Sequence, residues 1–170
     1  MEARRAGAQP ARASGPRRRL PKGGKVVSSR RSCARMRRLG VVKARVVLSG
    51  FKGSRECTAL VDTGAAMTVV DREVAEEVGV LRTGRRRALI SAGGHKLEGE
   101  VVVFRVLSVE GEVLDYEKAL EVELSGEVKE VLRGLGVDEH VIVGLATVEL
   151  AGFIPDTAAG KLRKVEAFLL

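Results

Sequence analysis

The sequence of 170 residues predicts one mostly β domain with short helices, which follows a basic N-terminal arm. From residue 40 onward, short runs of β-branched and aliphatic residues alternate with glycine-containing turn segments, a pattern typical of strands and hairpins. Residues 1–38 combine almost no apolar periodicity with many arginines. We therefore divide the chain into an arm at residues 1–38 and a folded domain at residues 39–170.

The arm has 13 Lys and Arg against one acid (13 − 1 = +12), whereas the rest of the chain has 17 against 21 (17 − 21 = −4). Such a segment buries too little apolar surface to offset its ordering entropy, so we expect it to be disordered. Its arginines could give weak, sequence-independent nucleic-acid binding. The alternatives are a solvated tail, a mis-assigned start with Met36 as the initiator, or an organellar targeting segment.

Nine segments of the domain are predicted to be strands because β-branched and aliphatic residues cluster there between turn residues. They are residues 41–48, 57–61, 68–70, 87–90, 97–107, 113–124, 141–143, 153–154 and 162–168. The first two form a hairpin, and the last two close the domain around Gly160. The fourth and fifth form a long hairpin whose tip, residues 91–96, contains two glycines that permit a tight reversal.

Three short helices are expected between these strands. Asp71 is a suitable N-cap for a helix at residues 72–78, which Gly79 ends. Four aliphatic residues at helical spacing predict a second helix at residues 127–135, and residues 146–150 form a helical turn.

Several functional classes lack their motifs in this sequence. It has no apolar run long enough for a membrane span, no nucleophile elbow, no phosphate loop and no His-Glu-x-x-His. Two cysteines, Cys33 and Cys57, are too few for a disulfide framework, so we expect a soluble, cytoplasmic protein. We interpret both histidines, His95 and His140, as solvated loop residues, and we expect no metal and no cofactor.

Asp62 is the acid in the most unusual setting. It follows the apolar run at residues 59–61 and precedes Thr63, Gly64 and Ala65, small residues that allow two backbones to approach closely. A carboxylate placed after a buried strand is costly without a partner, and such carboxylates concentrate at functional sites. On these residues alone, an Asx turn before glycine is an equally good interpretation.

The segment ALVDTGAAMTVV, residues 59–70, resembles the active-site loop of retropepsin-like aspartic proteases, the family of retroviral proteases and their cellular relatives. Its continuation is most similar to the protease domain of the DNA-damage-inducible ubiquitin-shuttle proteins and to small archaeal and bacterial relatives. The segment VIVGL, residues 141–145, resembles the second signature of the family, an aliphatic run that lies beside the active-site loop. The glycine-tipped hairpin lies between the two signatures, where the family has its flap. The resemblance covers residues 41–168, although only the two signatures are specific.

This resemblance implies a single-lobe retropepsin-like acid-protease β-barrel that acts on polypeptides as a two-fold homodimer. Aspartic-protease chemistry needs two carboxylates that share one proton, and the chain has one Asp-Thr-Gly loop, so each subunit would supply one Asp62. Asp156-Thr157-Ala158 lacks the glycine, and we reject it as a second site. Thr63 and Gly64 would support the loop. The expected substrate-binding residues are Ala65, Ala66, Ala92, Gly93 and Gly94.

Some positions depart from the retroviral pattern. Ala66 and Met67 stand where retroviral enzymes commonly have acids, and Leu145 stands where many have arginine. Residues 124–138 are longer than in compact retroviral proteases, and their place, at the dimer edge or the substrate cleft, stays open. One alternative function is a catalytically idle fold used for dimerisation or peptide binding. The other is a dimeric platform for a nucleic-acid-binding arm.

Overall fold

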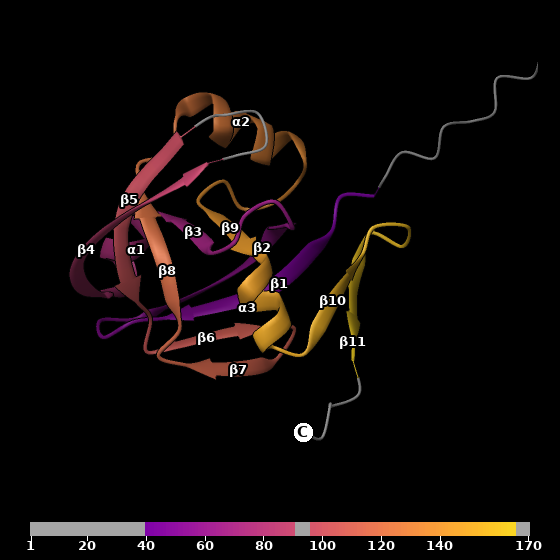
Figure 1. Ribbon diagram of the computed structural model, residues 1–170, viewed down its shortest axis with the longest axis horizontal. Helices are drawn as coiled ribbons and strands as arrows, with labels where there is room; N and C mark the ends of the chain where they lie inside the picture. The colour runs from indigo at the N-terminus through magenta and orange to yellow at the C-terminus, as the bar shows by residue number, and fades with distance from the viewer. Residues whose placement is uncertain (1–39, 91–95, 166–170) are drawn as a thin grey trace, which may run out of the picture. The chain divides into compact units, whose positions relative to one another are not determined.

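A long mixed sheet dominates the part of the chain that the computed structural model describes, residues 40–90 and 96–165 (Figure 1). This confirms the predicted mostly β fold with short helices. The strands are β1 (Lys43–Ser49), β2 (Ser54–Asp62), β3 (Thr68–Asp71), β4 (Leu81–Ile90), β5 (Lys96–Val103), β6 (Val106–Val109), β7 (Glu112–Asp115), β8 (Lys118–Val122), β9 (Val141–Gly144), β10 (Phe153–Asp156) and β11 (Lys161–Lys164). The helices are α1 (Arg72–Val78), α2 (Gly126–Gly134) and α3 (Leu145–Leu150).

Neighbouring strands follow the order β10-β11-β1-β2-β9-β3-β8-β5-β4, and β6 pairs with both β1 and β7. Most pairs are antiparallel, but three are parallel, namely β1 with β11, β2 with β9, and β3 with β8. These parallel pairs join segments that are far apart in the sequence. They bring the ends of β2 and β9 to the same place in the sheet.

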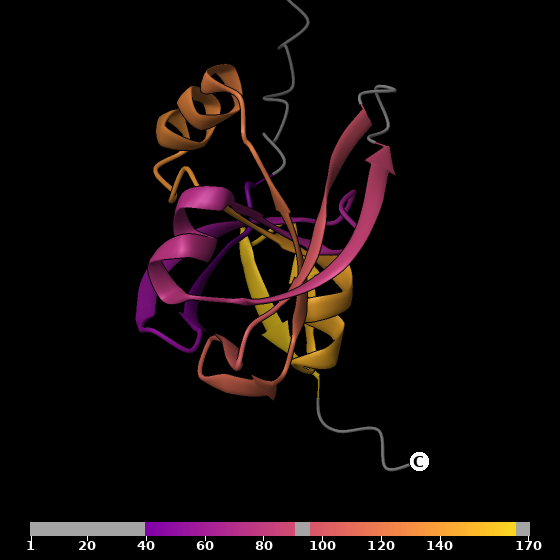
Figure 2. The same cartoon turned by 90° about the vertical axis from the view of Figure 1, so that its left-hand side faces the viewer.

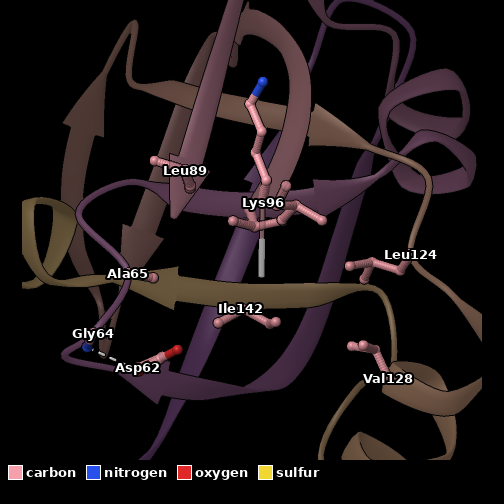
Figure 3. A pocket seen from close by; sticks show the side chains of 10 residues that line it. Asp62, Gly64, Ala65, Leu89, Lys96, Leu124, Val128 and Ile142 are labelled. Atoms are coloured by element: carbon pink, nitrogen blue, oxygen red, sulfur yellow. Dashed lines mark hydrogen bonds between the residues drawn. The ribbon is translucent and has the colours of Figure 1, made fainter. Parts of the chain in front are cut away.

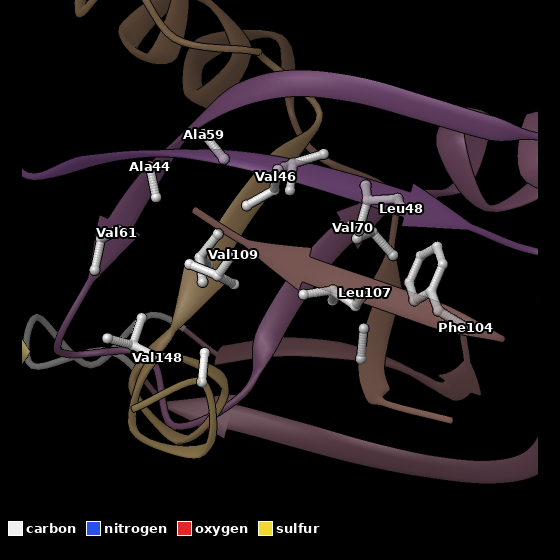
Figure 4. Close-up of a cluster of buried hydrophobic side chains, with 14 of the residues drawn as sticks. Ala44, Val46, Leu48, Ala59, Val61, Val70, Phe104, Leu107, Val109 and Val148 are labelled. Carbon is white, nitrogen blue, oxygen red and sulfur yellow. The ribbon is translucent and has the colours of Figure 1, made fainter. Parts of the chain in front are cut away.

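The larger core lies where β1, β2 and β6 turn alternate residues inward (Figure 4). Val46, Leu48, Leu107 and Val109 are fully buried there, because side chains on a strand alternate between the two faces. A smaller cluster contains the buried residues Val69, Val101, Leu120, Val122 and Leu124. Two of its residues, Val69 and Leu124, line the pocket described below.

The predicted helices are confirmed within one residue at each end. Asp71 caps α1 by accepting a hydrogen bond from the N–H of Glu73, and Gly79 ends the helix with a φ of 72°. Ser125 caps α2 through a bond from the N–H of Val128. Figure 2 shows α1 and α2 at the left of the view and the end of the β4–β5 hairpin, which forms one edge of the sheet, at the upper right.

Two predicted strands are each broken into two, so the expectation for residues 97–107 and 113–124 was wrong. The chain turns at Phe104, whose N–H donates to Glu117 O, and at Tyr116, which has a φ of 54°. Neither corner contains a glycine or a proline, so the sequence pattern did not reveal them. β4 also begins at Leu81 rather than residue 87. The arginines in its first half are exposed on an edge strand, where charged side chains are favoured, so they are compatible with a strand that the apolar pattern does not show.

No helix within residues 40–90 and 96–165 is both long enough and apolar enough to cross a membrane. The predicted arm at residues 1–38 lies outside the described residues, as do the predicted flap residues Ala92, Gly93 and Gly94 and the histidine His95.

Candidate active site

Asp62 is the last residue of β2 and pairs with Gly144, the last residue of β9. Its Oδ1 accepts a hydrogen bond from the N–H of Gly64 at 2.8 Å, and its backbone O accepts one from the N–H of Ala65 at 3.1 Å. The structure therefore contains the Asx turn that the sequence allowed, and it lies at the meeting point of the two signature segments.

The carboxylate of Asp62 is exposed, which corrects the expectation of an acid that is costly to bury. Val61 is buried, but the chain turns immediately after β2 and carries Asp62, Thr63 and Gly64 to the surface. The site of one chain is therefore open to solvent on the side where these three residues lie.

Hydrogen bonds from the first residues of α3 hold the loop that follows Asp62. The N–H of Leu145 donates to Ala65 O at 2.8 Å, and the N–H of Ala146 donates to Ala66 O at 3.3 Å. These bonds satisfy backbone groups at the start of α3, where Gly144 provides no side-chain cap. The segment at residues 141–145 thus lies beside the loop, as the sequence led us to expect.

A buried chain of hydroxyl groups lies under the same loop. Thr68 Oγ1 accepts a hydrogen bond from the N–H of Gly144 at 3.1 Å and donates to Thr147 Oγ1 at 2.8 Å. Thr147 Oγ1 in turn donates to Glu117 Oε1 at 3.1 Å. This network links β3, β9 and α3 beneath Asp62. Our sequence reasoning did not assign Thr147 or Glu117 to the site, because no motif marks them.

Gly144 is required by the close packing of β9 against the loop. A Cβ atom at this position would lie 2.2 Å from the carbonyl carbon of Met67, which leaves no room for any side chain. Gly64 is less restricted, because its Cβ would meet Asp62 Oδ1 at 3.2 Å.

Asp62 lies at the edge of an apolar pocket of about 210 Å³ (Figure 3). The pocket is lined by Asp62, Gly64, Ala65, Val69, Leu89, Lys96, Leu97, Leu124, Val128 and Ile142. Of the predicted substrate-binding residues, Ala65 lines the pocket and Ala66 does not. Leu89 and Leu97 were missed, although their placement opposite each other across the hairpin was an available signal. Val128 was assigned to a helix but not to the site.

A charged cluster fixes α2 beside this pocket. Asp71 Oδ2 accepts a hydrogen bond from the N–H of Leu124 at 3.0 Å and lies 3.2 Å from Lys129 Nζ, which is also 3.2 Å from Glu73 Oε1. Burial alone would raise the pKa of Asp71, but the N–H groups of Glu73 and Leu124 and the ammonium of Lys129 lower it overall. Asp71 is therefore ionised in the folded protein at neutral pH.

His140 belongs to the same cluster, so its interpretation as a solvated loop residue was wrong. Its side chain is 14% exposed, and its Nδ1 lies 3.9 Å from both Asp71 Oδ1 and Glu73 Oε2. Among the described residues, Asp71, Glu73 and His140 are the one group whose ligand atoms are close enough to hold a metal ion. Lys129 places one cation between the two carboxylates.

Comparisons with known proteins place this geometry in a family. No curated protein matches the sequence. Among solved structures, the chain is similar to a retropepsin-like aspartic protease from Rickettsia conorii, with 16% sequence identity and a TM-score of 0.40 over 70% of this chain and 95% of that chain. A family model described as aspartyl protease matches residues 42–147, more than half of the chain, and this span includes both Asp62 and Gly144. The chain belongs to the aspartyl protease family.

Proposed function

We propose that the protein is a homodimeric, retropepsin-like aspartic endopeptidase in which each subunit supplies one Asp62. The observation that carries this proposal is the position of Asp62, an exposed carboxylate at the end of β2, beside Gly144 and at the edge of an apolar pocket. Exposure on one side leaves space for a second copy to bring its own Asp62 to the same place.

The second acid must come from another chain. Within residues 40–90 and 96–165, the other Asp-Thr pair begins at Asp156. Its Oδ1 accepts hydrogen bonds from the N–H groups of Ala158 and Ala159 in the turn between β10 and β11. Asp156 therefore caps its own turn.

In the proposed mechanism, the two Asp62 carboxyls share one proton. The ionised one takes a proton from a water molecule, whose oxygen attacks the scissile carbonyl carbon, while the protonated one donates a hydrogen bond to the carbonyl oxygen. The tetrahedral intermediate then breaks its C–N bond as the leaving nitrogen takes a proton from the pair. The products are a carboxylic acid and an amine, and no covalent enzyme intermediate forms.

Other residues have supporting roles in this proposal. Thr63 braces the paired loops across the two-fold axis, and Gly64 and Ala65 offer backbone groups to an extended peptide. Ala92, Gly93 and Gly94 belong to a flap that closes over the peptide. Ala66 and Met67 lack the acids of retroviral enzymes, which supports a closer relation to the cellular and prokaryotic branch. We place the enzyme in the cytoplasm, where the thiol of Cys57 stays reduced.

The test compares the full-length protein with Asp62→Asn on an unfolded protein mixture from pH 3 to pH 7, with and without a pepstatin-type inhibitor. Cleavage that the substitution abolishes supports the proposal. Equal products from both proteins indicate a contaminating protease and contradict it.

A mixing experiment tests the shared site. Adding an excess of Asp62→Asn protein to a fixed amount of wild type should lower the activity, because exchange produces dimers with a single ionisable acid. Activity that stays constant after full exchange contradicts the shared site. A folded dimer with no activity at any pH favours a peptide-binding module instead.

A further inference from the structure

We propose that α2 forms the specificity wall of the pocket and that Val128 sets how large an apolar substrate side chain next to the scissile bond can be. This inference rests on the proposed endopeptidase function and adds a specificity-determining residue to it.

Three parts of the fold surround the pocket (Figure 3). Val69 and Ile142 form its base, and Leu89 and Leu97 of the β4–β5 hairpin form one side. The side toward α2 comes from Leu124 and Val128. Residues 124–138, whose place the sequence left open, therefore lie at the substrate pocket.

The size and polarity of the pocket determine what it can hold. Its volume is about 210 Å³, larger than the ~150 Å³ apolar cavity that holds benzene in an engineered protein. It therefore has space for one aromatic or long aliphatic side chain. The charged residues that line it are Asp62, assigned to the chemistry, and Lys96, which is paired with Glu98. A charged substrate side chain would be desolvated there without a partner, so Phe, Leu and Met fit best.

Val128 can line the pocket because its side chain is not needed to fill the core. Leu132 is the buried residue of α2, whereas the Val128 side chain is 37% exposed. Val131, on the same helix, is 62% exposed and does not line the pocket. Substitutions at residue 128 should therefore change the pocket without disrupting the core, and residue 131 provides a matched control.

Contacts on both sides of Val128 hold it in place. Its own N–H donates to Ser125 Oγ at 3.4 Å, and the adjacent Lys129 binds Asp71 and Glu73. Asp71 also accepts the hydrogen bond from Leu124, the other wall residue. One buried carboxylate thus fixes both residues of the wall, which is what selection by shape requires.

The experiment measures kcat/KM for short peptides that differ in one residue next to the scissile bond, with Trp, Phe, Leu or Ala at that position. The enzymes are the full-length wild type, Val128→Phe, Val128→Ala and the controls Val131→Phe and Val131→Ala. Val128→Phe should lower the Phe-to-Ala preference about tenfold or more, and Val128→Ala should raise the Trp-to-Leu preference about tenfold. The controls should stay within about twofold of wild type.

Two failures can be told apart. If Asp62-dependent cleavage occurs but the preferences of the Val128 and Val131 variants do not differ, the role assigned to Val128 is contradicted and the protease function stands. If wild type shows no Asp62-dependent cleavage of any peptide, the proposed function fails, and the inference fails with it. Circular dichroism checks that Val128→Phe folds, and Val128→Ala tests the same point if it does not.

Discussion

At the scale of single residues, the candidate site depends on how closely β9 approaches the loop after Asp62. Gly144 makes this approach possible, since a Cβ there would overlap the carbonyl group of Met67. Any side chain must push the two backbones apart, and the pairing between Gly144 and Asp62 would be the first contact to be lost.

We therefore expect Gly144→Ala to lower the free energy of unfolding by about 3 kcal/mol and to abolish cleavage. Urea denaturation and the peptide assay measure the two effects. Gly134→Ala is the matched control, because a Cβ at the end of α2 meets nothing within 4 Å. This control should keep full activity and should raise the free energy of unfolding by up to ~1 kcal/mol. Equal behaviour of the two variants would contradict the role assigned to Gly144.

The buried hydroxyl of Thr68 provides a second comparison. Thr68→Val removes the acceptor for the N–H of Gly144 and should lower the free energy of unfolding by about 2 kcal/mol, because a buried N–H then lacks a partner. Thr147→Val leaves that bond in place and should have the smaller effect on activity. Denaturation and kcat for both variants test this order. A larger loss of activity in Thr147→Val would contradict this order. It would show that activity depends on the hydrogen bond from Thr147 to Glu117 more than on the bond from Gly144 to Thr68.

Some of these residues could be predicted from the sequence and others could not. Asp62 was identified because a charged residue directly after an apolar strand is unusual and because its motif is specific. Val128 and Leu89 could not be identified as pocket residues, since an aliphatic side chain that lines a pocket looks in sequence like one that fills a core. Predicting them requires knowing which side chains face open space, rather than other side chains, once the chain has folded.

At the scale of helices and strands, α2 is held mainly by polar contacts. Leu132 is its buried residue, and Lys129 binds both Asp71 and Glu73 across to α1. The helix positions were predicted correctly because caps and apolar spacing are local signals. The corners at Phe104 and Tyr116 were not, since they depend on long-range hydrogen bonds between the two turns.

Loosening α2 should affect substrate binding more than chemistry. We expect Lys129→Gln to weaken the packing of α2 beside the pocket by about 1 kcal/mol. KM for the Phe peptide should rise about fivefold, with kcat changed less than about twofold. Lys129→Arg keeps the charge and should recover most of the affinity. Steady-state kinetics of both variants measure the split. An equal loss of kcat in Lys129→Gln would mean that the helix acts on Asp62 itself.

The same cluster makes the free energy of unfolding depend on pH. The pKa of Asp71 is lowered in the folded state, so its contribution to stability is fully present above its unfolded pKa of about 3.9 and is lost as pH falls through the lower folded value. Asp71→Asn should reduce the free energy of unfolding by about 2 kcal/mol at pH 7 and should flatten its decline below pH 4. Urea denaturation at pH 7, 4 and 3 measures both effects. Parallel curves for the two proteins would exclude Asp71 as the titrating group.

At the scale of the whole molecule, the charge is divided unevenly between the two parts of the chain. Residues 1–38 have a net charge of +12, and the rest has −4, so we assign any nucleic-acid binding to the arm. Deleting residues 1–38 should abolish salt-dependent binding of random-sequence DNA and leave peptide cleavage unchanged. Electrophoretic mobility shifts at 50 and 200 mM salt measure the first effect. Salt-dependent binding that survives the deletion would contradict this assignment.

The parallel pairing of β2 with β9 also has a consequence for when this protein becomes active. Gly144 and Thr68, which meet under the loop, are 76 residues apart in the chain. A contact of such long range cannot form until the intervening segments have been made, and closing so long a loop is slow. While the ribosome is still synthesising β9, Asp62 has already emerged but has no partner strand to hold its loop. A chain whose β9 has not yet been made therefore lacks the contacts that hold the loop at Asp62, and the topology delays assembly of the candidate site until β9 is in place.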